Sequence, residues 1–304
     1  MKKVILSLFL SVVSLTAFAQ KKLPYKWEYG CHTFASNYLG DMGGKEKTRR
    51  DFVADIKLGQ TRYDFGGYAR MKINQNFSLK GVVSYIRVQG ADNLSTNAGR
   101  VGRNLSFTNN IIEGALHGEY YFYQNNDMSR GSGLGKKKKG IDFKSYVFGG
   151  IAAFYNNPKT TYQGSKVKLR PLQTEGYKYK AIQLAIPIGA GFVYTINRQL
   201  KIGFEFDLRK TFTDYVDDVS TVYIAGAPSV ANRRNELTDP SLPHPDNYIT
   251  GEKRGDPKHK DFYMTAGITF GYALKGKNSF YKSKYSYITG VKRKFKKRRT
   301  RAKF

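Results

Sequence analysis

Few side chains in this sequence have the type and spacing that catalysis requires. His32 and Ser36 lie four residues apart, and a serine hydroxyl attacks a substrate only when a base such as an imidazole stands beside it. Glu205 and Asp207 would share one face of a strand and could act as an acid/base pair. In a small barrel, however, charged interior groups usually serve to pair with one another. We therefore predict no enzymatic activity, with a small enzyme acting on lipid through His32 and Ser36 as the alternative.

The sequence offers little to a metal ion or cofactor. The four histidines, His32, His117, His244 and His259, show no H-x-x-x-H spacing and no Cys/His spacing for zinc. No phosphate-binding glycine loop or G-x-S-x-G elbow stands between a strand and a helix. The segment Asp214-Tyr215-Val216-Asp217-Asp218 could bind a divalent cation through its carboxylates, but a solvated loop start is the favoured interpretation. We expect no cofactor and no metal.

The elements that hold these residues are indicated by a period of two in hydrophobicity. From Phe262 to Leu274 every second residue is apolar, and the residues between them are mainly small or polar. The same alternation runs over 182–196 and, after the short connection 197–199, over 202–208. Such alternation predicts β-strands. Five weaker segments complete a set of eight strands: 27–37, 62–73, 77–88, 111–123 and 146–155.

The composition places these strands in a membrane barrel. The chain of 304 residues contains 23 Tyr, 20 Phe and 31 Gly. Aromatic side chains favour pleated surfaces, and glycine marks turns and close packing. Single-chain bacterial barrels have an even number of strands whose residues alternately face lipid and lumen. The predicted fold is all-β, an eight-stranded antiparallel transmembrane β-barrel over residues 20–274, with a soluble β-sandwich as the alternative.

The first residues indicate export. Lys2 and Lys3 precede a mainly apolar run over 4–13, and Ala17-Phe18-Ala19 fits a signal-peptidase site. The run is shorter than the roughly 20 apolar residues that a membrane-spanning helix needs. Residues 1–19 are therefore predicted to be a cleaved signal peptide. Gln20, not a lipid-accepting cysteine, follows the cut.

The lengths of the connections predict an orientation in the outer membrane. The connections 74–76 and 197–199 are short, and they alternate with long ones at 38–60, 89–109, 156–178 and 213–260. Outer-membrane barrels have short periplasmic turns and longer outer loops. Both mature termini and the 124–143 connection are therefore predicted to lie in the periplasm.

The predicted inward face carries charges of both signs. An eight-stranded barrel is only wide enough for its own side chains to fill it. Because an unpaired buried charge is costly, we expect these side chains to pair and to exclude a wide pore. The inward charged residues are predicted to be Glu28, Arg62, Asp64, Arg70, Lys80, Glu113, His117, Glu119, Glu205, Asp207 and Arg209.

Basic residues gather on the predicted periplasmic side. The formal charge is +29 and becomes +27 once Lys2 and Lys3 are lost with the signal peptide. Residues 275–304 form a tail with thirteen Lys or Arg and no acidic residue. Such clusters steer acidic partners through long-range attraction, although a solvated tail is the alternative. Export argues against nucleic acid, so the expected partners are an acidic periplasmic protein or anionic lipid. The candidate partner-binding residues are Lys136, Lys137, Lys138, Lys139, Lys292, Arg293, Lys294, Lys296, Lys297, Arg298 and Arg299.

Cys31 is the only cysteine. A lone cysteine in an oxidising compartment can form a disulfide with another chain. Its place early in the first strand would put it near the periplasmic end, within reach of a periplasmic partner. A small buried hydrophobic side chain is the alternative.

Three segments, spread along nearly the whole mature chain, carry a family resemblance. Glu28-Tyr29-Gly30, followed by the segment that contains Asn37, Tyr38, Gly40 and Asp41, resembles the first strand and loop of PorG-like outer-membrane proteins of the type IX secretion system. The segment 213–220, with Asp214, Tyr215, Asp217 and Asp218, resembles the most distinctive segment of that family. The segments 254–257 and 261–272 resemble its last strand. The 124–143 connection and the extension after Leu274 depart from the pattern.

The resemblance implies a non-enzymatic barrel of a protein secretion machine. Its partners would be the periplasmic ring lipoprotein and the associated ring protein, which the barrel would anchor or assemble at the outer membrane. A filled barrel suits such a role, because it cannot itself be the conduit. A surface-binding barrel that uses its long loops is the remaining alternative.

Overall fold

The computed structural model describes residues 25–42, 58–95, 98–126, 142–196, 199–224, 251–258 and 260–274, together with Leu237 and Pro240. The predicted signal peptide, the lysines 136–139, His244, His259 and the basic tail lie outside this part of the chain. Within it, no helix is both long and apolar enough to cross a membrane.

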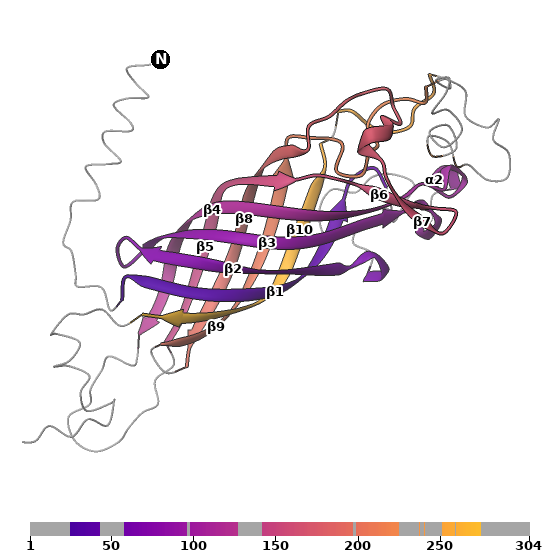
Figure 1. Ribbon diagram of the computed structural model, residues 1–304. Helices are drawn as coiled ribbons and strands as arrows, with labels where there is room; N and C mark the ends of the chain where they lie inside the picture. Colours follow the sequence, from indigo (N-terminus) through magenta and orange to yellow (C-terminus); the bar gives the residue numbers. More distant parts are fainter. Residues whose placement is uncertain are drawn as a thin grey trace, which may run out of the picture.

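Eight long antiparallel strands form a closed barrel (Figure 1). Around the ring their order is β3-β2-β1-β10-β9-β8-β5-β4, and the pairing of β3 with β4 closes it. The barrel strands are β1 (Trp27–Leu39), β2 (Arg62–Lys72), β3 (Phe77–Ala91), β4 (Ser106–Asn126), β5 (Asp142–Tyr155), β8 (Ile182–Thr195), β9 (Leu200–Thr211) and β10 (Phe262–Ala273). We call the end with the short β2–β3 and β8–β9 connections the turn end, and the opposite end the loop end.

The predicted fold class is confirmed, and each of the eight predicted strands is present. The structure adds a short hairpin at the loop end that the sequence reading missed, β6 (Lys159–Tyr162) and β7 (Ser165–Lys168). Its turn residues Gln163 and Gly164 both have positive φ, 46° and 77°, which is typical of a two-residue hairpin turn. The loop end also holds the helix α2 (Ala98–Arg103) and the 3-10 helices η3 (Leu58–Gln60), η4 (Asp92–Leu94) and η6 (Arg170–Leu172).

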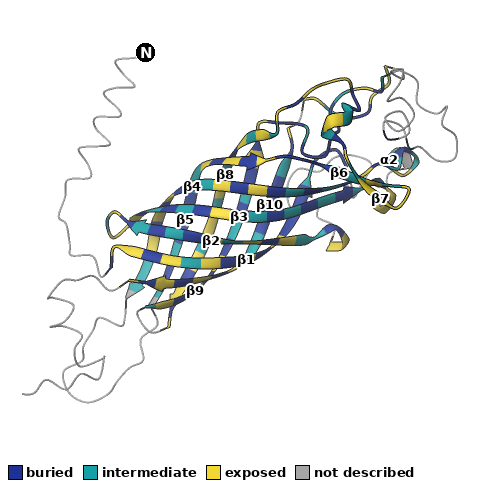
Figure 2. Ribbon diagram, in the orientation of Figure 1, coloured by how far each residue is buried: buried dark blue, intermediate teal, exposed yellow. Residues whose placement is uncertain are grey.

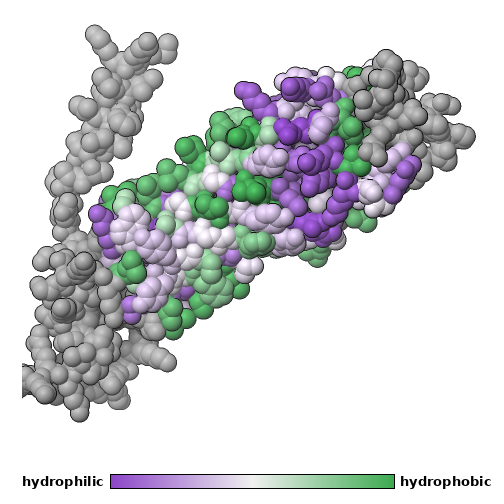
Figure 3. Space-filling view, viewed as in Figure 1, coloured by the Kyte–Doolittle hydropathy of each residue, from purple (hydrophilic) through white to green (hydrophobic). Residues whose placement is uncertain are grey.

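Buried and exposed residues alternate along the strands, as Figure 2 shows. Polar and charged side chains face inward, whereas the outward positions are mostly apolar. Hydrophobic residues spread along the barrel body and hydrophilic ones gather toward the loop end (Figure 3). This arrangement is the inverse of a soluble β-sandwich, which buries its apolar residues between two sheets.

Aromatic side chains form a girdle near each end of the apolar exterior. At the turn end the exposed rings are those of Trp27, Tyr29, Phe77, Tyr120, Phe122, Tyr123, Tyr194 and Tyr272, and at the loop end those of Tyr63, Phe65, Tyr155 and Phe212. Two girdles that flank an apolar band are typical of barrels in the outer membrane, where the rings lie at the two interfaces. The barrel exterior therefore has the surface expected for contact with lipid.

Inward-facing glycines allow aromatic rings to fill the lumen. Gly189 on β8 lies beneath the ring of Phe148 on the neighbouring strand β5. A Cβ at this position would collide with that ring and with the carbonyl oxygen of Phe206 on β9. Glycine is therefore required here for the strands to pair closely while the ring covers them.

Candidate functional site

Charged side chains from opposite walls of the barrel meet in its interior. Strands β3 and β9 are four places apart in the ring of eight, so they face each other across the lumen. Lys80 on β3 places its Nζ 2.6 Å from Oε2 of Glu205 on β9, and both side chains are buried. This ion pair crosses the lumen and fills its middle.

Arg70 on β2 is the centre of the network. Its guanidinium lies 2.5 Å from Glu28 on β1, 2.8 Å from Glu119 on β4 and 3.4 Å from Glu205 on β9. The side chain is 1% exposed. One cation thus compensates carboxylates from three strands, which is what makes the burial of these charges tolerable.

A second cation organises the half of the lumen nearer the loop end. Arg209 on β9 pairs with Glu113 on β4 at 2.8 Å and with Asp207 at 3.2 Å. The prediction that interior charges pair with one another is confirmed by these contacts. Arg62 has the predicted inward register, directly paired with the buried Ser36, but it lies half-buried at the loop end of β2 and donates to the carbonyl oxygens of Gly59 and Thr61 and not to an interior carboxylate.

Positive and negative charge are separated along the lumen. Apart from the central Lys80–Glu205 pair, the described inward residues of the turn-end half are four cations (Arg70, Lys72, Lys144 and Lys201) and two carboxylates, Glu28 and Glu119. In the loop-end half, Arg209 faces the carboxylates of Asp64, Glu113 and Asp207. The turn end of the described barrel is therefore the more positive end.

Polar side chains that the sequence reading missed complete the filling. The buried Tyr68, Tyr121 and Tyr146 donate hydrogen bonds to Glu28, Glu119 and Glu205. Lys201 binds Glu28, and the Lys72 ammonium lies 4.8 Å from the centre of the Tyr25 ring. Their inward position at every second residue of their strands is the signal that could have identified them.

The candidate pair His32 and Ser36 is not joined by a hydrogen bond in the barrel. Ser36 donates its hydroxyl to the carbonyl oxygen of Arg87 at 2.5 Å, not to His32. His32 contacts both Ser84, at 3.2 Å, and Asp64, at 3.1 Å, through the same ring nitrogen, Nε2. A catalytic triad needs serine on one imidazole nitrogen and the carboxylate on the other. This buried trio therefore has the components of a triad without its geometry.

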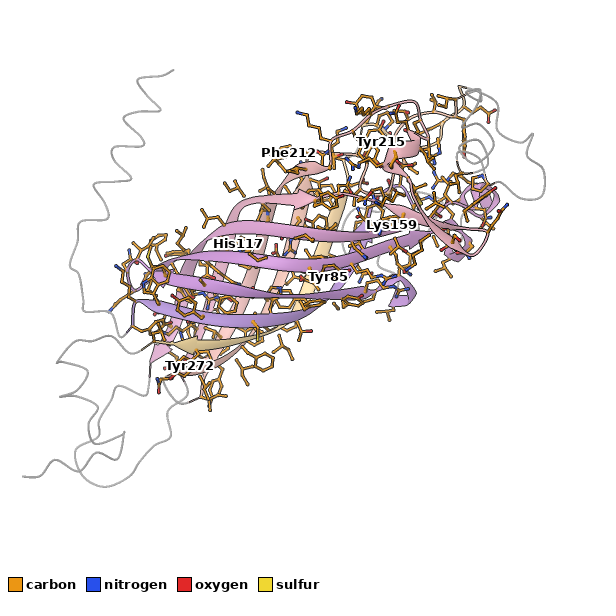
Figure 4. All side chains as sticks on the ribbon, viewed as in Figure 1. Tyr85, His117, Lys159, Phe212, Tyr215 and Tyr272 are labelled. Carbon is orange, nitrogen blue, oxygen red and sulfur yellow. The ribbon has the colours of Figure 1, made fainter. Side chains whose placement is uncertain are left out.

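The loop end is closed by the segment 213–220, which we call the cap. Val216 and Val219 are fully buried in the apolar cluster beneath the loops. The carbonyl oxygens of Tyr215 and Val216 accept hydrogen bonds from Asn156, at 2.7 Å, and Asn109, at 2.9 Å. Figure 4 shows Tyr215 at this end of the molecule, with Tyr272 at the opposite end.

The favoured interpretation of residues 214–218 as a solvated loop start is wrong. Asp214, Asp217 and Asp218 are at most 2% exposed. Asp218 accepts hydrogen bonds from Thr174 and Tyr179, and its carbonyl oxygen accepts one from Arg254 at 2.7 Å. In the described part of the chain, no group of three or more His, Cys, Asp or Glu side chains is arranged to hold a metal ion.

The three segments that carry the family resemblance meet around the cap. Tyr38 donates a hydrogen bond to Asp261 at 2.5 Å, and the other oxygen of Asp261 accepts one from the backbone N–H of Val216 at 2.9 Å. Asp41 accepts a hydrogen bond from the backbone of Asp256 at 2.7 Å. These distant segments are therefore parts of one buried polar cluster.

The remaining family-motif residues also have partners at the loop end. Asn37 donates a hydrogen bond to Thr61 at 3.0 Å. A Cβ at Gly40 would collide with the Tyr38 hydroxyl and the Asp261 carboxylate, so only glycine fits beside this pair. Tyr215 stacks on Tyr179 with ring centres 4.8 Å apart.

Comparison with known proteins identifies the family. Residues 2–224 match the family described as Domain of unknown function (DUF6089). The chain belongs to this family. No curated protein matches the sequence.

Solved structures of small outer-membrane barrels share low similarity with this DUF6089 chain. The N-terminal barrel domain of Pseudomonas aeruginosa OprF has 11% identity, with 81% of this chain and 97% of that chain covered and a TM-score of 0.31. Neisserial surface protein A has 8% identity, 82% and 96% coverage and a TM-score of 0.35. Pseudomonas aeruginosa OprG has 10% identity, 83% and 98% coverage and a TM-score of 0.35. Because the identities and TM-scores are this low, we infer no ligand, activity or partner of this chain from these structures.

The buried carboxyls of the cap make its stability depend on pH. Burial, with a smaller contribution from Glu175, raises the pKa of Asp218 to about 6. Burial and the neighbouring carboxylates raise the pKa values of Asp217 and Asp261 well above their usual range. The folded cap therefore binds protons more tightly than the unfolded chain does.

We expect the cap to open more readily at pH 8 than at pH 5. The stabilisation from protonated Asp218 is complete below the ordinary aspartate pKa of about 4 and is lost as the pH rises through the folded value. Hydrogen exchange at the amides of Val216 and Val219, corrected for intrinsic rates, measures this opening. Amides in the middle of β9 serve as the control and are expected to change little. Greater protection of the cap at pH 8 would contradict the prediction.

Cys31 lies on the outer wall of this DUF6089 barrel. Its side chain is exposed, and the residues directly opposite are Phe270 on β10 and Gly67 on β2. The alternative of a buried side chain is therefore wrong. A disulfide through Cys31 remains a prediction, and a partner chain would have to meet it on the apolar exterior close to the turn-end girdle.

In vesicles, Cys31 is expected to react with a lipid-soluble maleimide at least about tenfold faster than with a charged one. The reason is that a charged reagent partitions poorly into the apolar layer. Mass spectrometry of the labelled chain measures both rates, and detergent-solubilised protein is the control in which the difference should shrink. Non-reducing gels of wild type and Cys31→Ser from cells test the disulfide; identical bands would exclude it.

Proposed function

We propose that this DUF6089 chain is a non-enzymatic outer-membrane barrel that anchors a periplasmic complex of the type IX secretion machinery. The complex would contain the periplasmic ring lipoprotein and its associated ring protein. The machine component is suggested by the resemblance of the segments 28–41, 213–220 and 254–272 to PorG-like proteins. These three segments meet at the cap, so the residues that carry the resemblance belong to one structural unit.

The lumen-crossing ion pair is the observation that carries the anchoring role. Lys80 and Glu205 join opposite walls at 2.6 Å, and Arg70 joins Glu205 to two further carboxylates, Glu28 and Glu119. A barrel filled in this way has no room for a folded protein to pass. A membrane foothold suits it better than a conduit does.

The apolar exterior and the lengths of the connections support placement of the barrel in the outer membrane, with its turn end toward the periplasm. The apolar band between two aromatic girdles fits the outer membrane. With the short β2–β3 and β8–β9 connections, the start of β1 and the end of β10 at the turn end, that end would face the periplasm.

Electrostatics favours an acidic periplasmic partner. The turn-end half of the lumen has an excess of cations among its described residues, and the sequence adds Lys136–Lys139 and a tail with thirteen basic residues. Positive charge of this extent would speed association with an acidic protein, and the effect would weaken in salt.

Affinity purification of the full-length chain from its native membranes tests the proposal. Wild type is expected to recover the ring lipoprotein, identified by mass spectrometry. A chain truncated after Leu274, and a Lys136→Gln/Lys137→Gln/Lys138→Gln/Lys139→Gln variant, should recover it at least about tenfold less because the attraction is lost. The matched control removes charge at the loop end (Lys178→Gln/Lys180→Gln/Lys253→Gln/Lys260→Gln) and should leave recovery unchanged.

One result would overturn the anchoring role, and another would overturn only the assignment of the basic segments as the dock. Absence of the ring lipoprotein from the wild-type eluate would separate the chain from the secretion machine. Equal recovery with all variants would show that the basic segments are not the dock. Loss of recovery only in the loop-end control would instead favour a surface-binding barrel.

A further inference from the structure

The β6–β7 hairpin continues the wall of the barrel beyond its rim. Lys159 on β6 pairs directly with Thr108 on β4, and Lys168 on β7 pairs directly with Lys159. Directly paired residues point to the same face of a sheet. Thr108 lies on the outward face of β4, since its neighbours Phe107 and Asn109 are buried. Lys159 and Lys168 are therefore placed on the continuation of the lipid-facing side.

The opposite face of the hairpin is held against the core. Tyr162 and Val167 pack against the apolar cluster that includes Val216 and Val219 of the cap. This contact holds the hairpin in one orientation, with the lysines outward. Lys166, two residues from Lys168 on the same strand, shares their face.

Arg87 on β3 extends this basic surface toward the membrane. It is directly paired with Asn110 on β4, two residues from Thr108, and it lies on the outward face of β3. Its Nε is buried and has no hydrogen-bond partner among the described residues. We call Arg87, Lys159, Lys166 and Lys168 the outer cationic face.

The height of this face matches lipid headgroups. Tyr85, Ile112 and Tyr155 form one row of paired outward residues at the loop-end girdle. Lys159 is paired with Thr108, which lies four residues beyond Ile112 on β4. Four residues span about 13 Å along a strand. For a strand tilt near 40°, this is a rise of about 10 Å along the membrane normal. The headgroup layer is about 5–8 Å thick on each side of the hydrocarbon. Flexible lysine side chains can bridge the remaining distance.

The charges on this face lack compensation within the described strands. Lys159 and Lys168 stand directly opposite each other, an arrangement of like charges that destabilises a strand pair. The other outward residues beyond the girdle on β3, β4 and β6 include Gln89, Thr108 and Thr161, and no carboxylate is among them. A dianionic group between the two ammonium groups would remove their repulsion. Figure 4 marks Lys159 on this hairpin, and Figure 3 shows hydrophilic residues gathered over the same region.

We propose that the outer cationic face binds the phosphorylated headgroups of outer-leaflet glycolipid. This inference rests on the membrane orientation in the proposed function, but not on the secretion machine or its ring. Phosphate groups fit because they carry up to two charges and accept several charge-assisted hydrogen bonds from lysine and arginine. Anionic lipids attract each nearby basic residue in this way, and salt weakens the attraction.

Native mass spectrometry of the full-length protein tests the proposal. The protein is equilibrated in detergent with equal amounts of diphosphoryl lipid A and its dephosphorylated form, and the retained lipid is counted. Wild type is expected to retain the diphosphoryl form in preference. The variant Lys159→Gln/Lys166→Gln/Lys168→Gln should lower that retention about tenfold or more. The control Lys178→Gln/Lys180→Gln/Lys260→Gln removes the same charge from exposed loop-end positions and should behave as wild type.

Other outcomes would overturn this inference. Equal retention by wild type and the hairpin variant would show that the face does not select phosphate. If soluble polyphosphate binds to the face and diphosphoryl lipid A does not, the partner is a soluble polyanion and not the membrane. The chain truncated after Leu274 should keep the preference for diphosphoryl lipid A. Loss of ring-lipoprotein recovery would therefore contradict the proposed function alone, whereas loss of lipid retention would contradict this inference alone.

Discussion

Replacement of Arg70 by methionine is expected to lower the free energy of unfolding by about 3–5 kcal/mol. The guanidinium compensates Glu28, Glu119 and Glu205, all of which are buried. Without the guanidinium, the three carboxylates would stay buried while one of the positive charges that compensates them is lost. Urea unfolding of the barrel in lipid, followed by the different electrophoretic mobility of folded and unfolded chains, measures the loss.

A matched arginine on the same strand provides the control. Arg62 donates only to backbone carbonyl oxygens at the loop end, so Arg62→Met should change stability by less than about 0.5 kcal/mol. Adding Glu119→Gln to Arg70→Met should recover part of the loss, because among the described residues Glu28 still pairs with Lys201 and Glu205 with Lys80, whereas Glu119 pairs with Arg70. If Arg70→Met costs no more than Arg62→Met, the network does not stabilise the barrel.

Gly189→Val is expected to destabilise the barrel by about 3 kcal/mol. Its side chain would meet the ring of Phe148 and the backbone oxygen of Phe206. The ring could rotate away only at the expense of lumen packing, and the backbone oxygen belongs to the neighbouring strand, so β8 and β9 would have to separate. The same unfolding measurement gives the size of the effect.

Gly81→Val is the control for Gly189→Val. Gly81 faces outward on β3, and a Cβ there would meet no atom within 4 Å. We expect a change within about 0.5 kcal/mol, because the added methyl groups would contact lipid. Equal losses at the two glycines would mean that valine acts through strand propensity and not through the collision at position 189.

The two proposed binding regions lie at opposite ends of the barrel. The turn end, with an excess of lumen cations, is proposed to meet a periplasmic partner. The loop end is closed by the cap and carries the outer cationic face on its side. Between the ends the lumen is filled by paired side chains, which suits the proposed anchor because it need not pass material.

The sequence by itself determined the strands. In a barrel each residue faces either lipid or lumen, so the alternation is direct physical evidence, and all eight strands were found from it. Their ends were less accurate. The strand β4 extends to Ser106 and Asn126, beyond the apolar band, where outward residues are polar and the contrast between the faces is weak.

Only the tertiary structure decided which charges meet. Lys80 and Glu205 are 125 residues apart, and nothing local distinguishes them from other inward residues. Ring closure makes their strands diametrically opposite. Arg62 has the same inward spacing as Asp64, but it lies at the strand end, where the chain turns and water competes with the lumen.

The contacts of the cap were likewise not predictable from the local sequence. Three aspartates within five residues are typical of a solvated loop, because burial of isolated carboxylates is costly. Burial is tolerated here because Thr174 and Tyr179 donate hydrogen bonds to the Asp218 carboxylate from another segment, and Arg254 donates one to the Asp218 carbonyl oxygen. Local sequence contains the charges, whereas the partners that permit their burial are supplied by the folded barrel.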